Sequence, residues 1–301
     1  MKVMGSETLG KLFPWRNRSK LHRLGPTEKF AVFLLIALSI FMLMPLVYIL
    51  NHALKPYQEL FIYPPNIFVR NPSFQNFVEL LAITKGTAIP ITRYIFNSVV
   101  VAILCVIIVT IVSAMCAYPI SKHKFPGHKI VFGMILLTLL FAPETVAIPR
   151  YLVVSKLGIM NTYFGHIMPM VAVPTGVFLM KQFIDQLPNE LLDSAKMDGA
   201  REYTIFMKIV LPVIMPAVAT IGIIAFNAAW GNTETSTLFM QQEEMKTFPF
   251  YISTLTSGMA NNVARQGAAA AAALLMFLPN LIIFLLFQSK VIATMAHSGI
   301  K

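Results

Sequence analysis

Residues 187–212, which read LPNELLDSAKMDGAREYTIFMKIVLP, form a polar stretch between apolar segments and decide the fold. Pro188 suits the first turn of a helix, where its missing N–H is not needed, and Glu190 lies near the positive N-terminal end of that helix. Gly199 can adopt the left-handed conformation that ends a helix. The stretch therefore predicts a short helix over about 188–198, a bend at Gly199, and a second helix that continues into the next apolar segment.

The predicted short helix has one apolar side. Leu187, Leu191 and Ala195 are four residues apart, with Leu192 three residues before Ala195, and residues at these spacings are neighbours on a helix surface. In a soluble protein such a side packs on its own domain, but this chain has no soluble domain to receive it. We therefore expect the short helix to dock onto another protein chain.

The composition indicates an integral membrane protein. Of the 301 residues, 56% are hydrophobic and 12% are charged, whereas a soluble domain is typically about a quarter charged. The formal net charge is +11. Most basic residues lie beside apolar segments, where they suit the anionic surface of a membrane better than a nucleic acid. We therefore expect a lipid bilayer, and no nucleic acid, among the partners.

Six apolar segments are long enough, at about 1.5 Å per helical residue, to cross a bilayer core of about 30 Å. The predicted fold is therefore an all-α membrane protein with six transmembrane helices, and the 187–212 stretch connects spans four and five. The spans are expected at 30–50, 94–118, 130–148, 164–184, 209–230 and 265–288.

Spans three to five contain several helix breakers, which a membrane tolerates only beside protein or a water-filled cavity. They suit a gated path, although an ordinary kink in a packed bundle explains any one of them equally well. The small residues of 268–273 in span six favour close helix packing. The breakers are Pro143, Pro149, Pro169, Pro174, Gly176, Pro212 and Pro216.

The distribution of Lys and Arg predicts the orientation of the chain. Six spans place both termini on one side, and the segments on that side hold sixteen of the 24 Lys and Arg residues. Basic residues favour the cytosolic side. We therefore expect cytosolic termini and a cytosolic 187–212 stretch, with a basic tail over 1–29, a transmembrane domain over 30–288 and a C-terminal tail over 289–301.

The 187–212 stretch resembles the "EAA" loop of the membrane subunits of binding-protein-dependent ABC importers. The pattern of that family is Glu-Ala-Ala, three residues, Gly, nine residues, Ile, one residue and Leu-Pro. This chain keeps every spacing, with Asp193 in place of Glu and Ser194 in place of the first Ala. The flanking residues around Pro188 and Asp198 resemble the carbohydrate-importing branch of the family, and the resemblance extends from about residue 30 to the C-terminus.

The resemblance implies a function and a set of partners. Such a chain is a permease subunit that forms, with a second homologous permease subunit, the translocation path for a sugar, here expected to be an oligosaccharide. Two separate ATP-binding subunits hold ATP and magnesium, so this chain is expected to have no cofactor and no enzymatic activity of its own. An extracytoplasmic solute-binding protein delivers the carbohydrate. The implied location is the inner or plasma membrane of a bacterial cell, which the chain crosses several times.

We expect the short helix to be the contact with the ATPase. Leu191, Ala195 and Gly199 would form the contact, while Glu190 and Asp193 would meet basic groups or helix N-termini. Leu211-Pro212 would set the angle at which the loop enters span five. The expected coupling residues are Glu190, Leu191, Asp193, Ser194, Ala195, Asp198, Gly199, Ile209, Leu211 and Pro212.

A sugar site combines amide or carboxylate hydrogen bonds with aromatic faces. Four residues have this chemistry, and two of them, Asn227 and Trp230, are three residues apart on a helix. Core packing and interfacial anchoring explain the four residues about as well. The candidates for the substrate path are Asn97, Asn227, Trp230 and Glu234.

The resemblance also implies a contact with the binding protein. In relatives such as the maltose importer, the loop between the last two spans reaches into the binding protein. An aromatic belt at the membrane interface is the alternative explanation of the aromatic residues here. The candidates are Phe248, Pro249, Phe250 and Tyr251.

The alternative function is a stand-alone secondary carrier or channel for a small polar solute. Ion-driven carriers usually keep acidic residues or His inside the membrane, and charges are absent from the middle of each expected span. The six His residues are scattered without metal-ligand spacing. The sequence therefore favours the importer subunit over the carrier and over a membrane enzyme.

Overall fold

The computed structural model describes residues 25–60, 62, 66, 68–85, 89–259 and 266–298, and in this part of the chain the regular structure is entirely helical. The all-α prediction is confirmed for the described residues. The described residues up to Leu50 form one compact unit, and the described residues from Asn51 onward form another. Most of the expected basic tail over 1–29 lies outside the described residues.

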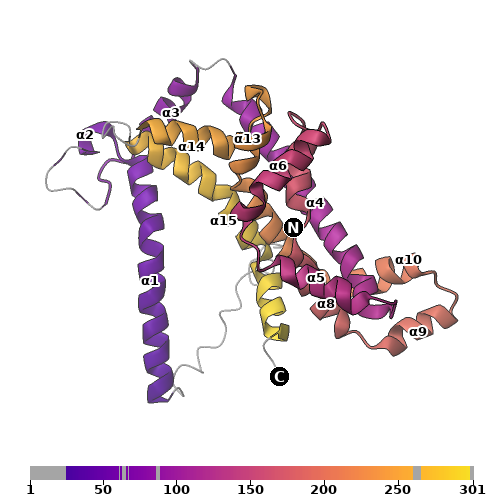
Figure 1. Cartoon of the computed structure of the whole chain (residues 1–301). Coiled ribbons are helices and arrows are strands. Elements are labelled where there is room, and N and C mark those ends of the chain that lie inside the picture. Colours follow the sequence, from indigo (N-terminus) through magenta and orange to yellow (C-terminus); the bar gives the residue numbers. More distant parts are fainter. Residues whose placement is uncertain are drawn as a thin grey trace, which may run out of the picture. The chain divides into compact units, whose positions relative to one another are not determined.

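The helices follow one another in the order of the chain, as the colours of Figure 1 show. Their bounds are α1 Pro26–Leu54, α2 Tyr57–Leu60, α3 Gln75–Lys85, α4 Ile91–Lys122, α5 His128–Thr138, η3 Pro143–Val146, α6 Ala147–Lys156, α7 Tyr163–Val171, α8 Pro174–Asp185, α9 Asn189–Met197, α10 Glu202–Ile205, the π-helix η4 Phe206–Val210, α11 Leu211–Val213, α12 Met215–Trp230, α13 Glu234–Phe239, η5 Glu243–Met245, α14 Phe248–Met259 and α15 Gln266–Ser298.

Several helices are apolar enough to cross a membrane. Among the described residues α1, α4 and the segment Gln266–Gln288 of α15 meet this criterion by length and composition. Two bent pairs also meet it, namely α7 with α8, and Glu202–Val213 with α12. These segments correspond to five of the six expected spans.

The third expected span, 130–148, is not one helix. Helix α5 ends at Thr138 after 11 residues, which cover about 16 Å, or half of a bilayer core. Ala142 is extended, with φ −68° and ψ 137°, because the ring of the following proline disfavours helical backbone at the preceding residue. The chain then continues as η3 and α6, so the count of six spans is not reproduced as six helices.

Helix α4 is the centre of the second unit. It packs against α12 and α8, and α15 packs against α12 and α3. Small residues lie at these contacts, among them Ala117 of α4 and Ala217 of α12, both fully buried. The small-residue face expected in 268–273 is also found, since Ala268, Ala271 and Ala272 are fully buried. Small side chains let helix backbones approach closely.

The proline-rich segments are bent where the breakers predict. The axes of α7 and α8 differ by 51°, and those of Glu202–Val213 and α12 differ by 78°. The bend before α12 lies at Ile214, with φ −84° and ψ 9°, two residues after Pro212. Pro216 has no N–H to donate to the carbonyl of Pro212, so the helical hydrogen bonds are interrupted there.

Candidate functional site

The predicted short helix and its bend are both present. Helix α9 covers Asn189–Met197 and follows Pro188. Gly199 has φ +79°, and its N–H donates to the carbonyl of Lys196 at 3.0 Å. The N–H of Ala200 donates to the carbonyl of Ala195 at 3.0 Å, so the helix ends with a left-handed cap. We call residues 187–202 the docking loop.

The apolar side of α9 is divided between the protein core and the surface. Leu187 and Leu192 are buried in the core of this chain, at 7% and 5% exposure, and Ala195 packs partly against that core. Leu191 and Met197 are 43% and 89% exposed. Leu187 and Leu192 therefore anchor the helix in the core, which corrects their expected place on one exposed apolar side. Exposed Met197 was not among the apolar residues expected on that side.

The remaining expected coupling residues lie in two kinds of environment. The polar ones lie at the surface of α9 and its C-terminal cap, and the apolar ones line the segment that leads into α12, where Ile209 and Leu211 pack partly against the core. The exposed residues are Glu190, Asp193, Ser194, Asp198, Gly199 and Pro212.

Both ends of the docking loop are held by the C-terminal end of α4. The Nζ of Lys122 donates to the carbonyl of Leu187 at 2.6 Å and to Oδ1 of Asn189 at 3.1 Å. At the other end of the loop, the hydroxyl of Tyr118 donates to Oε2 of Glu202 at 2.8 Å. Figure 1 shows α9 and α10 at this end of α4. The exposed helix is thus presented on a fixed base.

Glu202 is the polar centre of this base. Lys196 contacts its Oε1 at 2.9 Å, and His123 lies 3.5 Å from its Oε2. The hydrogen bonds from Lys196 and Tyr118 lower the pKa of the Glu202 carboxyl to about 2. The carboxylate of Glu202 is therefore ionised throughout the physiological pH range.

Two of the four candidate path residues are buried and form hydrogen bonds within the chain. The side chain of Asn97 is fully buried. Its Nδ2 donates to the carbonyls of Glu244 and Lys246 at 2.8 and 2.9 Å, and its Oδ1 accepts from Tyr163 at 2.8 Å. The indole N–H of Trp230, which is 5% exposed, donates to the carbonyl of Met276 at 3.0 Å. Neither side chain has an N–H left to offer to a solute.

The other two candidates remain accessible. Asn227 is exposed, so it does not share a surface with the buried Trp230. Glu234 is partly exposed and forms an ion pair with Arg150. The pair joins the start of α13 to α6 and places a carboxylate and a guanidinium together.

A cavity of about 680 Å³ lies beside this ion pair, between α4, α5, η3 with α6, and the break between α7 and α8. Its lining is mostly apolar, but Ser113 and Arg150 also line it. The Oγ of Ser113 and the Nε of Arg150 are buried and have no hydrogen-bond partner among the described residues. An apolar cavity with a few unpaired polar atoms is the usual form of a small-molecule site.

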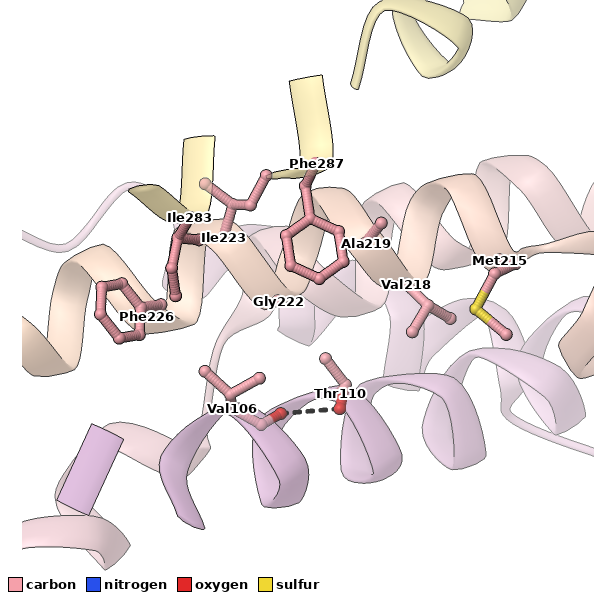
Figure 2. A pocket seen from close by; sticks show the side chains of 10 residues that line it. All are labelled: Val106, Thr110, Met215, Val218, Ala219, Gly222, Ile223, Phe226, Ile283 and Phe287. Carbon is pink, nitrogen blue, oxygen red and sulfur yellow. Dashed lines mark hydrogen bonds between the residues drawn. The ribbon is translucent and has the colours of Figure 1, made fainter. Parts of the chain in front are cut away.

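A second cavity, of about 200 Å³, lies between α4, α12 and α15. Figure 2 shows that its lining is apolar apart from Thr110, whose hydroxyl donates to the carbonyl of Val106 at 2.7 Å. The hydroxyl of Thr110 is the polar side-chain group of this lining, and its hydrogen is already used in that bond. This cavity therefore does not have the chemistry of a sugar site.

The aromatic residues proposed for the binding-protein contact face inward. Phe248, Pro249 and Tyr251 are buried, and Phe250 is half-buried with the Nζ of Lys246 4.5 Å from its ring centroid. Apolar side chains at the start of an amphipathic helix pack into the core when a neighbouring helix is available, and here Tyr251 stacks on Tyr94.

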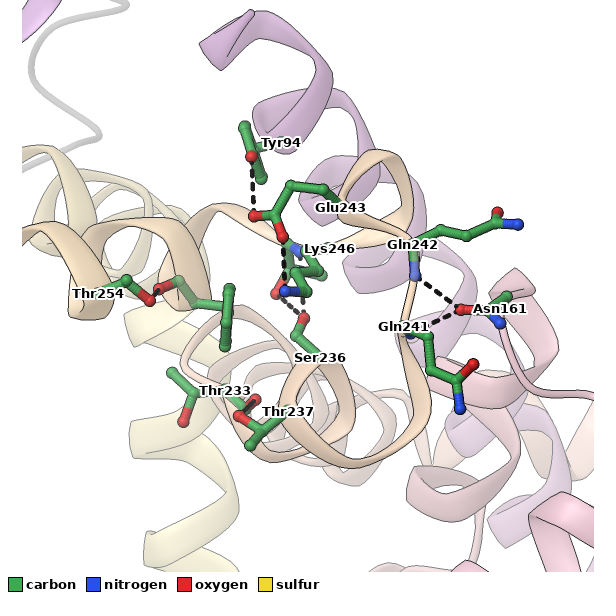
Figure 3. Close-up of polar contacts among 12 residues, drawn as sticks. Tyr94, Asn161, Thr233, Ser236, Thr237, Gln241, Gln242, Glu243, Lys246 and Thr254 are labelled. Atoms are coloured by element: carbon green, nitrogen blue, oxygen red, sulfur yellow. Dashed lines mark hydrogen bonds and ion pairs between the residues drawn. The ribbon is translucent and has the colours of Figure 1, made fainter. Parts of the chain in front are cut away.

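The residues before α14 carry the exposed surface instead. We call residues 240–247 the distal loop; Gln241 to Glu244 are exposed. Figure 3 shows Oδ1 of Asn161 accepting hydrogen bonds from the backbone N–H groups of Gln241 and Gln242, at 2.7 and 3.0 Å. Asn161 has φ +57°, a conformation that asparagine tolerates better than most residues.

Metal binding has no support from the described residues, which contain no group of three or more His, Cys, Asp or Glu side chains able to hold an ion. The contacts of His166 are those of a residue that holds the fold together. It is fully buried, with Nδ1 2.9 Å from Oγ1 of Thr235 and Nε2 2.9 Å from the carbonyl of Met245.

Comparison with known proteins identifies relatives over most of the chain. Residues 121–289 match the family model described as "Binding-protein-dependent transport system inner membrane component". The arabinooligosaccharides transport system permease protein of Bacillus subtilis is 30% identical, over 88% of this chain and 92% of that protein. The melibiose/raffinose/stachyose import permease protein of the same organism is 29% identical, over 81% of this chain and 85% of that protein.

Solved structures share the fold. A crystal structure of a bacterial ABC transporter involved in the import of the acidic polysaccharide alginate matches with a TM-score of 0.74 and 18% identity, over 88% of this chain and 98% of that chain. The same kind of transporter in complex with an alginate pentasaccharide-bound periplasmic protein matches with a TM-score of 0.56. At this level of identity the likeness concerns the fold alone.

Proposed function

Because the chain belongs to the family of binding-protein-dependent transport system inner membrane components, on the carbohydrate-uptake branch, we propose that it is the permease subunit of an ATP-driven importer for an oligosaccharide. A second, homologous permease chain completes the translocation path. Two separate subunits bind ATP with magnesium and hydrolyse it, so this chain is not the enzyme. A periplasmic or cell-surface binding protein delivers the sugar.

The docking loop carries this proposal. Its helix α9 has an apolar residue at each end of its exposed surface, Leu191 and Met197, and acidic side chains between and beside them. Two residues of α4 anchor the loop at both ends: Lys122 bonds to Leu187, and Tyr118 bonds to Glu202. A rigidly held helix with an exposed apolar and acidic surface suits docking into a groove on another protein. The expected contact residues Glu190 and Asp193 lie on this surface.

The proposed orientation places the docking loop and both termini in the cytosol of a bacterial cell. The excess of Lys and Arg on that side supports this orientation. The six-span topology is retained in the proposal, with α5 and the segment through η3 together taking the place of the third span. The break after Thr138 then lies within the membrane, where it requires a neighbouring protein surface or water.

The proposed sugar path runs along the larger cavity. Ser113 and Arg150 line this cavity. The Ser113 hydroxyl and the Arg150 Nε–H are unpaired but buried in this conformation, so their contact with a sugar requires the path to open around them. Glu234 adds a carboxylate held by Arg150. Together with the exposed amide of Asn227, these are the groups of the described residues that we propose contact a passing sugar. The apolar lining would contact the faces of the sugar rings.

The proposed contact with the binding protein lies at the distal loop. The aromatic residues Phe248, Pro249 and Tyr251 support this loop from within, and Gln241, Gln242 and Glu244 supply exposed polar groups. The names of the relatives, which include import systems for arabinooligosaccharides and for melibiose, raffinose and stachyose, support an oligosaccharide as the substrate.

The proposal is tested by reconstituting the chain with its partner subunits in liposomes. Uptake of labelled raffinose, trehalose and arabinooligosaccharides is measured with and without internal ATP, and with and without the binding protein. We expect uptake of at least one of these sugars that requires both. Uptake by the chain alone, without ATPase subunits, would instead establish the secondary carrier.

A further inference from the structure

We propose that α4 is a mechanical link that passes movement of the docking loop to the distal loop. The inference rests on the proposed function, in which the docking loop meets the ATPase. It adds two pairs of positioning residues: Tyr118 with Glu202 at one end of α4, and Tyr94 with Glu243 at the other. These groups touch neither sugar nor ATP.

The first clamp joins the C-terminal end of α4 to the docking loop. Tyr118 bonds to Glu202 and Lys122 bonds to Leu187 and Asn189, so one helix end holds both the beginning and the end of the loop. Movement of the loop as a body must therefore move this end of α4, or break these bonds.

The second clamp joins the N-terminal end of α4 to the distal loop. The hydroxyl of Tyr94 donates to Oε1 of Glu243 at 3.0 Å, and Nε of Arg93 donates to the carbonyl of Glu244 at 3.1 Å. The two hydrogen bonds from Asn97 hold the carbonyls of Glu244 and Lys246. Figure 3 shows Glu243 placed between Tyr94 and Lys246.

The helix between the two clamps is long and uninterrupted. Asn97 and Tyr118 are 21 positions apart, which corresponds to about 32 Å along a helix, close to the thickness of a bilayer core. The proline inside α4 is Pro119, beyond Tyr118, so the connecting segment lacks the usual cause of a sharp kink. Val101, Cys105 and Val109 hold its buried side at 2% exposure or less.

Both clamps end at exposed surfaces, which is what a link between two partners requires. Beyond the first clamp lies Met197 at 89% exposure, and beyond the second lie the exposed side chains of Gln241 and Gln242. Packed side chains, hydrogen bonds and rigid secondary structure can carry energetic coupling between distant sites, and α4 with its two clamps combines all three.

The test follows the two loops separately in the assembled transporter, in nanodiscs, without any sugar. In a background with Cys105→Ala and Cys116→Ala, a nitroxide is attached at Arg201→Cys in the docking loop or at Gln242→Cys in the distal loop. ATP with vanadate is the probe, and the change in the spectrum of each label is recorded. In this reference both labels are expected to respond.

Tyr118→Phe removes the hydroxyl that bonds to Glu202 and keeps the ring. We expect the Arg201 label to respond as in the reference and the response of the Gln242 label to fall about tenfold or more, because losing a hydrogen bond to a charged group shifts a local equilibrium by about ten- to a hundredfold. Tyr203→Phe is the matched control, since Tyr203 is exposed on α10 and outside both clamps. It is expected to leave both responses unchanged.

Each outcome either supports or overturns the proposed link through α4. An unchanged Gln242 response in Tyr118→Phe, or no Gln242 response in the reference, overturns the link. If Tyr118→Phe silences both labels, the test is repeated with Tyr94→Phe, which leaves the docking loop intact. A Gln242 label that still responds in Tyr94→Phe overturns the link. A reference assembly that neither binds nor hydrolyses ATP would refute the proposed function itself.

Discussion

Gly199 permits a sharp test of the docking loop, because the cost of replacing it comes from the backbone alone. Its φ is +79°, and a Cβ at this position would meet no atom within 4 Å. Most residues with a side chain pay about 1–2 kcal/mol in this left-handed conformation, and a β-branched residue is an outlier there. Gly199→Val therefore strains the bend without a steric clash.

The expected consequence is local. A strain of about 1–2 kcal/mol changes an equilibrium by a factor of about 5–30, so the ratio of chains that present α9 correctly to chains that do not should fall by that factor. The helices on either side keep their contacts, and the amount of protein inserted in the membrane should not change. We expect the amount of copurified ATPase subunit, and sugar uptake, to fall by up to that factor.

Gly199→Asn is the matched control. Asparagine has a side chain close to valine in size, but it tolerates the left-handed conformation. It should retain most ATPase binding and uptake, since the space around Gly199 accepts a side chain. Equal losses for Val and Asn would show that side-chain size at this position matters, not the backbone, and the reasoning would be refuted.

Three further predictions distinguish residues of the exposed surface from residues that hold the fold together. Met197→Asp, at an 89% exposed position, should leave the thermal unfolding midpoint in detergent unchanged while weakening copurification of the ATPase; a shifted midpoint would argue against a free surface. Leu192→Ala, at a 5% exposed position, should lower the stability of the chain by about 2–5 kcal/mol, and an unchanged midpoint would contradict its role in the core. Asn97→Leu should remove the hydrogen bond to the carbonyl of Lys246 and one of the two hydrogen bonds to the carbonyl of Glu244, which Arg93 also holds. The carbonyl of Lys246 then loses its partner at a cost of about 1–3 kcal/mol, and hydrogen exchange at residues 244–247 should become faster; unaltered exchange would show that other contacts hold the loop.

The docking loop was predictable because its signals are local. A proline before a helix, a glycine after it and the distance between them depend on residues within a few positions of one another. The structure has the expected helix at Asn189–Met197 and a left-handed Gly199. Even so, Leu191 and Leu192 are chemically identical, and only the position of the neighbouring core buries one of them and exposes the other.

The candidate path residues were less predictable because polar groups serve folds as well as ligands. Asn97 has the chemistry of a sugar contact, yet its amide holds the backbone of residues 244–246, about 150 positions away in the sequence. The unpaired atoms of Ser113 and Arg150 carry no sequence signal, since only the finished packing shows which polar atoms have been left without a partner.

The sequence by itself determined the membrane class, the helical fold, the breaks at the prolines and the shape of the docking loop. These properties follow from hydropathy and from backbone chemistry that each short segment carries with it. The tertiary structure alone decided which sides of the helices face the core, how the third expected span is divided, and that both ends of α4 are tied to exposed loops. Those outcomes depend on contacts between residues far apart in the chain, for which composition and spacing contain no record.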